Sequence, residues 1–336
     1  MLVTSKAILE ASLQAYKAGN PFAIGAYNVN NMEQMQAIVK AAKETKSPVI
    51  VQLSRGALKY AEDKYLRNII LAAAELNPEI PIAMHLDHGN SMETVKRVID
   101  LGFTSVMIDG SLMEDSKTPS TFEYNVKITS EVVKYAHDRG VSVEGELGTL
   151  GGFEDGVGSG REHLTNPEEA ADFVAKTGVD ALAISIGTSH GAHKFKGEAK
   201  IAYEIIEACR KLLPETALVS HGSSSVPKEL VDIINQYGGQ MEHTAGVPLD
   251  MLQKAITKGI NKINVDTDLR LAATAATRKY LAENPSKFDQ RDFAGAAREG
   301  IALEIIKRME AFSTGNHLQD VPNWGLEEMK AKYQGK

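Results

Sequence analysis

Three of the nine histidines in the chain, His88, His190 and His221, are each followed directly by glycine. Glycine has no side chain, so the backbone at such a position can pass close to a bound ion or ligand. Three imidazoles that converge on one point suit a zinc ion with an open fourth coordination position. A single histidine is more often a satisfied core residue, so the hypothesis needs a fold that brings the three together.

The stretch PIAMHLDHGN places Asp87 beside His88 at the end of a short apolar run. Polar residues are common at the end of a strand, simply because the strand reaches solvent there. The alternative is that a metal at His88 acts as a Lewis acid on a carbonyl group, while Asp87 serves as general acid and base.

Short apolar runs with little alternation recur along the chain, each followed by a helical pattern, as in parallel strands that are covered on both faces. We predict strands at 22–27, 48–53, 82–86, 105–108, 141–146, 181–186, 217–220 and 262–265. Between them we predict helices that include 32–45, 58–76, 93–101, 122–138, 167–176 and 248–258. This alternation predicts an α/β fold, a (β/α)8 TIM barrel with extra C-terminal helices from about Arg291. The competing open, doubly wound sheet usually has a glycine-rich loop after its first strand, where this chain has asparagines.

The composition has no break that would divide the chain. We therefore predict one barrel domain over residues 1–312, including the C-terminal helices, and a tail over 313–336. A net charge of −7 gives no hint of a nucleic-acid or membrane surface, and one cysteine builds neither a disulfide framework nor a cysteine metal cage. No run approaches the roughly 18 apolar residues of a membrane span, and the N-terminus does not read as a signal peptide, so we expect a cytoplasmic protein.

The active site of such a barrel lies at the carboxyl ends of its strands. Small and hydroxyl-bearing residues follow predicted strands 6 to 8, where barrels often bind phosphate, although such runs also form ordinary loops. The glycine-rich, acidic segment 145–160 is either a surface loop or a lid over the site. Predicted strands 3 to 7 contain no lysine, and Lys262 opens strand 8 at its opposite end, so a Schiff-base mechanism has few candidates.

Six motifs, HLDHG, SVMIDGS, VEGELGTLGG with a following EDG, IGTSHGAHKF, VSHGSSS and INVDTDLR, occur in this order. In types and spacing the chain resembles the class II, metal-dependent fructose-1,6-bisphosphate aldolases from about residue 1 to 312. The resemblance implies an aldehyde-lyase of glycolysis and gluconeogenesis. It would use zinc to cleave fructose 1,6-bisphosphate reversibly into dihydroxyacetone phosphate and glyceraldehyde 3-phosphate.

The resemblance also implies roles for individual residues. Asp87 would exchange the proton of the C4 hydroxyl, and Glu154 would handle the proton at C3. The metal ligands would be His88, His190 and His221, with Glu146 and Asp109 able to hold the ion in an alternative position. The implied substrate-binding and phosphate-binding residues are Asn28, Ser54, Gly191, Lys194, Gly222, Ser224, Asn264, Asp266, Thr267, Arg270 and Asp289.

Two phosphate sites are implied. The ketone-side phosphate would lie at the residues that follow strands 6 to 8, with a sodium or potassium ion near it. Ser54 and Arg270 would contact the other phosphate, with Arg270 reaching into a neighbouring subunit and Asp289 positioning it. An arginine that reaches into the site of a neighbouring subunit requires at least a homodimer. A homotetramer is the other expectation.

Two positions depart from the family pattern. His193 stands where the family usually has an aromatic residue, and Phe153 replaces a polar or acidic residue before Glu154. Tagatose-1,6-bisphosphate aldolase shares nearly all the motifs, so the sequence leaves the sugar epimer open. It also leaves open the native metal and the choice between dimer and tetramer. A zinc-dependent barrel hydrolase is a distant alternative, because such enzymes typically place an HxH pair at the end of strand 1, where this chain has Asn28 and no histidine. A non-catalytic binding barrel would not need the pair of Asp87 and His88.

Overall fold

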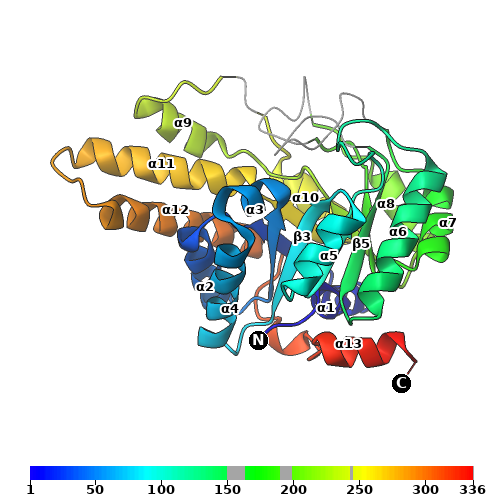
Figure 1. Cartoon of the computed structure of the whole chain (residues 1–336). Coiled ribbons are helices and arrows are strands. Elements are labelled where there is room, and N and C mark those ends of the chain that lie inside the picture. The colour runs from blue at the N-terminus through cyan, green and yellow to red at the C-terminus, as the bar shows by residue number, and fades with distance from the viewer. Residues whose placement is uncertain (150–162, 190–198, 243–244, 336) are drawn as a thin grey trace.

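The structure is a computed structural model that describes residues 1–149, 163–189, 199–242 and 245–335 (Figure 1). Eight parallel strands form a closed barrel in the order β1 to β8, with β8 paired to β1. The strands are β1 (Ile24–Asn28), β2 (Val49–Ser54), β3 (Ile82–Gly89), β4 (Ser105–Ile108), β5 (Ser142–Leu147), β6 (Ala181–Ile184), β7 (Ala217–Ser220) and β8 (Ile260–Val265). Every strand residue is buried, which explains why the runs show little alternation. The predicted TIM barrel is confirmed.

Helices surround the barrel and close one of its ends. They are α1 (Ser5–Lys17), α2 (Met32–Thr45), α3 (Arg55–Ala61), α4 (Asp63–Leu76), α5 (Met92–Asp100), α6 (Phe122–His137), α7 (Pro167–Thr177), α8 (Tyr203–Leu212), α9 (Lys228–Gln236), α10 (Leu249–Lys258), α11 (Thr267–Glu283), α12 (Gln290–Ala311) and α13 (Leu326–Tyr333). The prediction of a single helix over 58–76 is wrong, because Glu62 has a φ of +63° and separates α3 from α4. None of the helices in the described ranges is both long and apolar enough to cross a membrane.

Helix α11, which follows β8, and the extra C-terminal helix α12 lie side by side and extend beyond the barrel as an arm (Figure 1). Helix α12 also packs against α2 and touches β1. It therefore covers the seam where the last strand meets the first, and the arm is continuous with the helical ring.

The amino ends of the strands are closed by α1 and by the C-terminal segment. The Ser5 hydroxyl lies 2.6 Å from the Ser105 hydroxyl and 2.9 Å from that of Ser142, at the first residues of β4 and β5. Trp324 accepts a backbone hydrogen bond from Thr4. In Figure 1, α13 lies beside the N-terminal end of the chain. The predicted boundary between residues 312 and 313 stays a prediction.

Asp180 joins these elements at the amino end of β6. Its buried carboxylate accepts hydrogen bonds from Lys6, from the Val143 backbone and from the Tyr333 hydroxyl, each at 2.8 Å. His137 stacks on the Tyr333 ring and lies 2.9 Å from the same carboxylate. One acid thus ties α1, β5, α6 and α13 together.

We predict that Asp180→Asn lowers the free energy of unfolding by about 3 kcal/mol at neutral pH, because an amide cannot replace a buried carboxylate with several donors. Burial favours the neutral acid, but the hydrogen bond from His137 and the charge of Lys6 hold the pKa of Asp180 below its usual value. Such an acid stabilises the fold above its unfolded pKa and loses this effect as the pH falls through the folded pKa. Urea unfolding should therefore show a gap between wild type and variant that narrows below about pH 4. A gap that does not change with pH would contradict this role.

Candidate active site

Strand β3 delivers Asp87 and His88 into the same space, although neighbouring residues of a regular strand point to opposite faces. The pairing of β3 with β4 shifts register between Leu86 and Gly89, and His88 has a φ of +49°. A non-glycine residue with positive φ is uncommon, and bulges of this kind redirect a side chain. Arg55 Nε donates to the His88 carbonyl at 3.1 Å and holds the turn. The bulge therefore gives the site two adjacent functional groups from one strand.

The two histidine-glycine pairs that the structure describes use their glycines to admit neighbouring backbone. A Cβ atom at Gly89 would lie 2.5 Å from the Met107 carbonyl oxygen. A Cβ atom at Gly222 would lie 2.7 Å from the Ser189 backbone, and Gly222 has a φ of +59°. From the sequence, these glycines are predicted to let the backbone pass close to a metal or ligand. In the structure, both glycines make room for neighbouring backbone of the same chain. This lets the two histidines that precede them approach each other.

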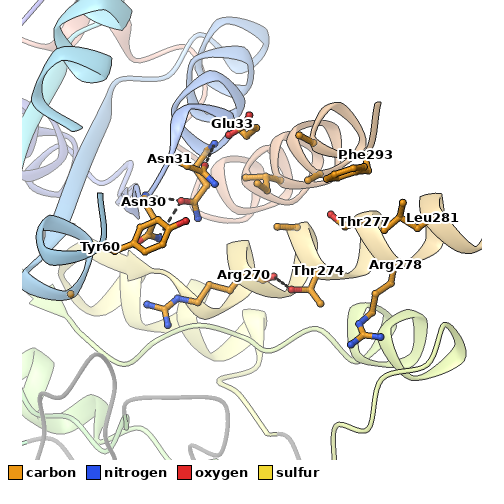
Figure 2. A pocket seen from close by; sticks show the side chains of 16 residues that line it. Asn30, Asn31, Glu33, Tyr60, Arg270, Thr274, Thr277, Arg278, Leu281 and Phe293 are labelled. Atoms are coloured by element: carbon orange, nitrogen blue, oxygen red, sulfur yellow. Dashed lines mark hydrogen bonds between the residues drawn. The ribbon is translucent and has the colours of Figure 1, made fainter. Parts of the chain in front are cut away.

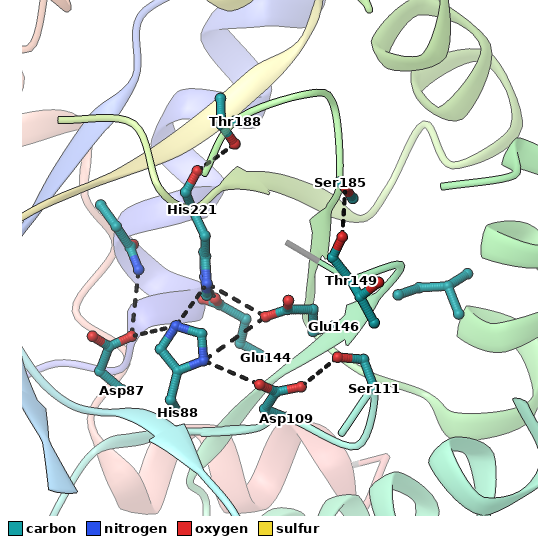
Figure 3. A network of polar contacts seen from close by, with 12 residues as sticks. Asp87, His88, Asp109, Ser111, Glu144, Glu146, Thr149, Ser185, Thr188 and His221 are labelled. Atoms are coloured by element: carbon teal, nitrogen blue, oxygen red, sulfur yellow. Dashed lines mark hydrogen bonds and ion pairs between the residues drawn. The ribbon is translucent and has the colours of Figure 1, made fainter. Parts of the chain in front are cut away.

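His88 and His221 meet at the carboxyl end of the barrel, with His88 Nε2 at 3.2 Å from His221 Nδ1 (Figure 3). On its other side, His88 Nδ1 lies 3.3 Å from Asp109 Oδ2. Glu146 Oε2 lies 3.4 Å from His221 Nδ1. Within the described part of the chain, two sets of side chains have ligand atoms within 4.8 Å of one another, Asp87 with His88 and His221, and His88 with Asp109 and Glu146. The third predicted ligand, His190, lies outside the described residues.

The charges in this cluster are unbalanced. Burial, together with the charge of Asp109, raises the pKa of Glu146 well above its usual range. Burial opposes the charged form of His88, but Asp87, Asp109 and Glu146 together outweigh it and raise the pKa of His88 to about 10. Glu146 Oε2 is buried without a hydrogen-bond partner among the described residues. Imidazole nitrogens and carboxylate oxygens in this arrangement fit a divalent metal such as zinc.

Three side-chain amides converge on the carboxylate of Asp87. Asn28 Nδ2 and Gln52 Nε2 each donate to Asp87 Oδ2 at 3.2 Å, and Asn264 Nδ2 donates to Oδ1 at 3.3 Å. Asn28 and Asn264 are predicted substrate contacts, whereas Gln52 has no predicted role. Gln52 also donates to Asn28 Oδ1 at 2.6 Å, so it orients both the acid and its neighbour.

A buried ion pair lies directly beneath His221. Glu144 Oε1 is 2.7 Å from His221 Nε2, and Lys262 Nζ donates to Glu144 Oε2 at 2.7 Å. Lys262 is expected at the far, amino end of strand 8, but β8 begins at Ile260 and the lysine side chain reaches Glu144 in the barrel interior. The sequence signal for this inward orientation is the two-residue period of a strand. It places Lys262 on the same face as Asn264, and Glu144 on the same face as Glu146.

The residues predicted to bind the ketone-side phosphate lie after β7 and β8. Ser224 Oγ accepts from the Asp266 backbone at 3.3 Å, and Asp266 precedes Thr267 at the start of α11. Gly191, Lys194 and Glu154 lie outside the described residues.

The residues predicted for the other phosphate are spread more widely. Ser54 ends β2 and caps α3. Arg270 Nε donates to Asp266 Oδ1 at 3.0 Å in its own chain. Asp289 lies at the tip of the arm, where it pairs with Arg291 at 2.5 Å. A contact between Asp289 and Arg270 stays a prediction.

We predict that Glu144→Gln weakens zinc binding by about 10-fold to 100-fold, because partners that orient a ligating histidine typically have effects of this size. A glutamine side chain cannot accept hydrogen bonds from both His221 and Lys262 at once. Competition with a chelator of known affinity would measure the change. The matched control is Glu215→Gln, which removes an exposed carboxylate that pairs with Lys17. Equal zinc affinities in the two variants would exclude the orienting role.

The comparisons with known proteins agree with this geometry. The family model described as fructose-bisphosphate aldolase class-II matches residues 8–317. The fructose-bisphosphate aldolase of Nostoc sp. is 50% identical over 334 residues, covering 95% of this chain and 93% of the relative. That of Giardia intestinalis is 52% identical over 315 residues, covering 93% of this chain and 95% of the relative.

Two solved structures whose titles describe aldolases have a similar fold. The YdjI aldolase from Escherichia coli K12 superimposes with a TM-score of 0.74 at 26% identity, covering 95% of this chain and all of that one. A putative fructose-1,6-biphosphate aldolase from Coccidioides immitis superimposes with a TM-score of 0.75 at 26% identity, covering 94% and 99% of the two chains. Because the family model matches residues 8–317 and relatives with this activity in their names are about 50% identical over most of the chain, the chain belongs to the class-II fructose-bisphosphate aldolase family.

Proposed function

We propose that this protein uses the cluster around Asp87 and His88 for zinc-dependent, reversible aldol cleavage of fructose 1,6-bisphosphate. The products would be dihydroxyacetone phosphate and glyceraldehyde 3-phosphate. The observation that carries the proposal is the bulge in β3, which turns a carboxylate and a metal-ligand candidate toward one point, with His88 Nε2 3.9 Å from Asp87 Oδ1. A cytoplasmic location remains part of the proposal.

Zinc would be held by His88 and His221 together with His190. When bound, zinc polarises the ketone carbonyl and stabilises the negative charge that develops as the C3–C4 bond breaks. The acids Asp109 and Glu146 offer oxygen donors on the other side of His88, which supports the alternative position expected for the ion. A sodium or potassium ion near the phosphate is proposed from the family resemblance alone.

Asp87 would take the proton of the C4 hydroxyl during cleavage and return it to the aldehyde oxygen during condensation. The three amides from β1, β2 and β8 keep its carboxylate aimed at this proton, and such positioning is a large part of general acid–base catalysis. The family resemblance assigns the proton at C3 to Glu154. A tagatose 1,6-bisphosphate aldolase would use the same groups on the opposite C4 epimer.

The ketone-side phosphate would bind where the loop after β7 meets the first turn of α11. Backbone N–H groups at the start of a helix carry partial positive charge and bind phosphate well. Gly222, Ser224, Asp266 and Thr267 are all buried around this point, which supports their predicted roles. Gly191 and Lys194 complete the proposed site.

We further propose that the protein is a homo-oligomer, a dimer at least, that assembles through the arm. A groove of about 970 Å³ lies between α2, α3, α11 and α12 and includes Tyr60, Arg270, Leu281 and Phe293 (Figure 2). Tyr60 is 77% exposed, and Phe288 at the tip of the arm is 92% exposed. Large apolar side chains exposed on the arm and beside it favour a partner surface, and Arg270 on the arm would serve the neighbour's phosphate site.

Cleavage of fructose and tagatose 1,6-bisphosphates by the purified protein, with and without EDTA, tests the function. We expect a preference for the fructose ester, loss of activity in EDTA and recovery on addition of zinc. Asp87→Asn is the matched variant and should retain zinc while kcat falls by about 100-fold to 10,000-fold. Activity that survives complete metal removal would overturn the metal mechanism. A preference for the tagatose ester would keep the mechanism and change the substrate.

For the assembly, we predict that Leu281→Glu shifts the protein toward a monomer in sedimentation velocity, because a buried unpaired charge weakens an apolar interface. Glu215→Gln, far from the groove, should leave the sedimentation coefficient unchanged. A wild-type protein that sediments as a monomer at micromolar concentration would contradict the proposal.

A further inference from the structure

The loop that follows β7 adopts an unusual backbone. Gly222 and Val226 both have positive φ angles, of +59° and +49°. Glycine adopts this conformation readily, but a β-branched residue such as valine does so only when its surroundings enforce it. The residues between them, Ser223 to Ser225, include the serine that we assign to the ketone-side phosphate. Some contact must therefore hold this loop in place.

That contact is the carboxylate of Asp268, in the first turn of α11. Asp268 Oδ2 accepts from the Ser225 backbone at 3.0 Å, and Oδ1 accepts from the Val226 backbone at 2.8 Å. Asp268 is completely buried. Both oxygens of one acid thus fix two consecutive peptide groups, including the strained residue. The motif INVDTDLR contains this acid, which has no predicted role.

A buried arginine on α12 completes the arrangement. Arg308 Nε donates to Asp268 Oδ2 at 3.0 Å, and Arg308 Nη2 lies 2.5 Å from Glu304 Oε1. The Arg308 and Glu304 side chains are each 2% exposed. The guanidinium orients the Asp268 carboxylate and offsets its negative charge. Without this cation, a bare carboxylate behind the loop would repel a phosphate in front of it.

We infer that Asp268 and Arg308 are positioning residues for the ketone-side phosphate, acting through the backbone of Ser225 and Val226. They hold the loop so that Ser224, whose hydroxyl accepts from the Asp266 backbone, lies ready at the start of α11. The Ser225 hydroxyl is buried and has no hydrogen-bond partner among the described residues, as expected of a polar group beside a ligand site. This inference rests on the phosphate site proposed above.

The test measures the affinity for inorganic phosphate by calorimetry and, separately, KM and kcat for fructose 1,6-bisphosphate. Asp268→Asn can accept only one of the two backbone hydrogen bonds. We expect phosphate affinity to fall and KM to rise, each by about tenfold. The value of kcat should stay within about threefold, because the groups around Asp87 are unchanged, and the zinc content should equal that of wild type. Arg308→Lys keeps the charge but not the planar guanidinium, so it should show a smaller change in the same direction.

The matched control is Asp180→Asn, at the opposite end of the barrel. It also removes a buried carboxylate that accepts from a backbone N–H group and from a basic side chain. It should destabilise the fold while leaving phosphate affinity unchanged. The positioning role is wrong if Asp268→Asn and the control Asp180→Asn lose phosphate affinity equally. It is also wrong if Asp268→Asn and Arg308→Lys bind phosphate like wild type.

Failure of the underlying phosphate site would give a different pattern. In that case phosphate would not compete with dihydroxyacetone phosphate on the wild-type protein, and Ser224→Ala would change neither KM nor phosphate affinity. If Asp268→Asn does not fold, the smaller Arg308→Lys change, compared with the Asp180→Asn control, decides the question.

Discussion

The carboxylates of Asp87, Asp109, Glu144 and Glu146 are buried together at the carboxyl end of one barrel. Buried charges are costly unless they are paired or hydrogen-bonded, so this arrangement constrains everything around it. Amides surround Asp87, Lys262 pairs with Glu144, and His88 contacts Asp109. Of these four acids, Glu146 has the least complete set of hydrogen-bond partners within the described residues, and its environment favours the neutral acid. A divalent cation at this point would supply the charge that the side chains lack.

The backbone meets this constraint through a few departures from regular geometry. The bulge in β3 turns His88 toward His221, and Gly89 and Gly222 let neighbouring strands and loops pass close enough for the two rings to meet. The loop after β7 is held in a strained form by an acid from the next element along the chain. In each case a side chain from one βα unit fixes the backbone of another. The site is therefore a property of the closed barrel rather than of any single motif.

Much of this architecture could be predicted from the sequence, because burial on both faces and regular alternation leave strong patterns. The eight strands, the barrel, and the proximity of Asp87, His88 and His221 all followed from strand order and strand ends. The break between α3 and α4 did not, because it depends on the positive φ of Glu62 within a continuous helical pattern.

Partners that meet across the barrel interior were the harder part. The two-residue period places Lys262 on the inner face, but its bond to Glu144 spans strands that are not neighbours in the sheet. Gln52 and Asp268 were missed for a related reason. Their roles depend on which backbone or side-chain group lies opposite, and this is set by tertiary packing rather than by local sequence.

The docking of the C-terminal segment beneath the barrel has a practical consequence. Tyr333 contacts Asp180 at the amino end of β6, so Gln334 and Gly335 lie on the side of the barrel opposite the histidine and carboxylate cluster. The amino group of Met1 is instead held by the Ile80 carbonyl at 2.8 Å. A tether to a bead, an electrode or a second enzyme is therefore better placed at the C-terminus than at the N-terminus. Attached there, the molecule would turn the carboxyl end of its barrel toward the solution.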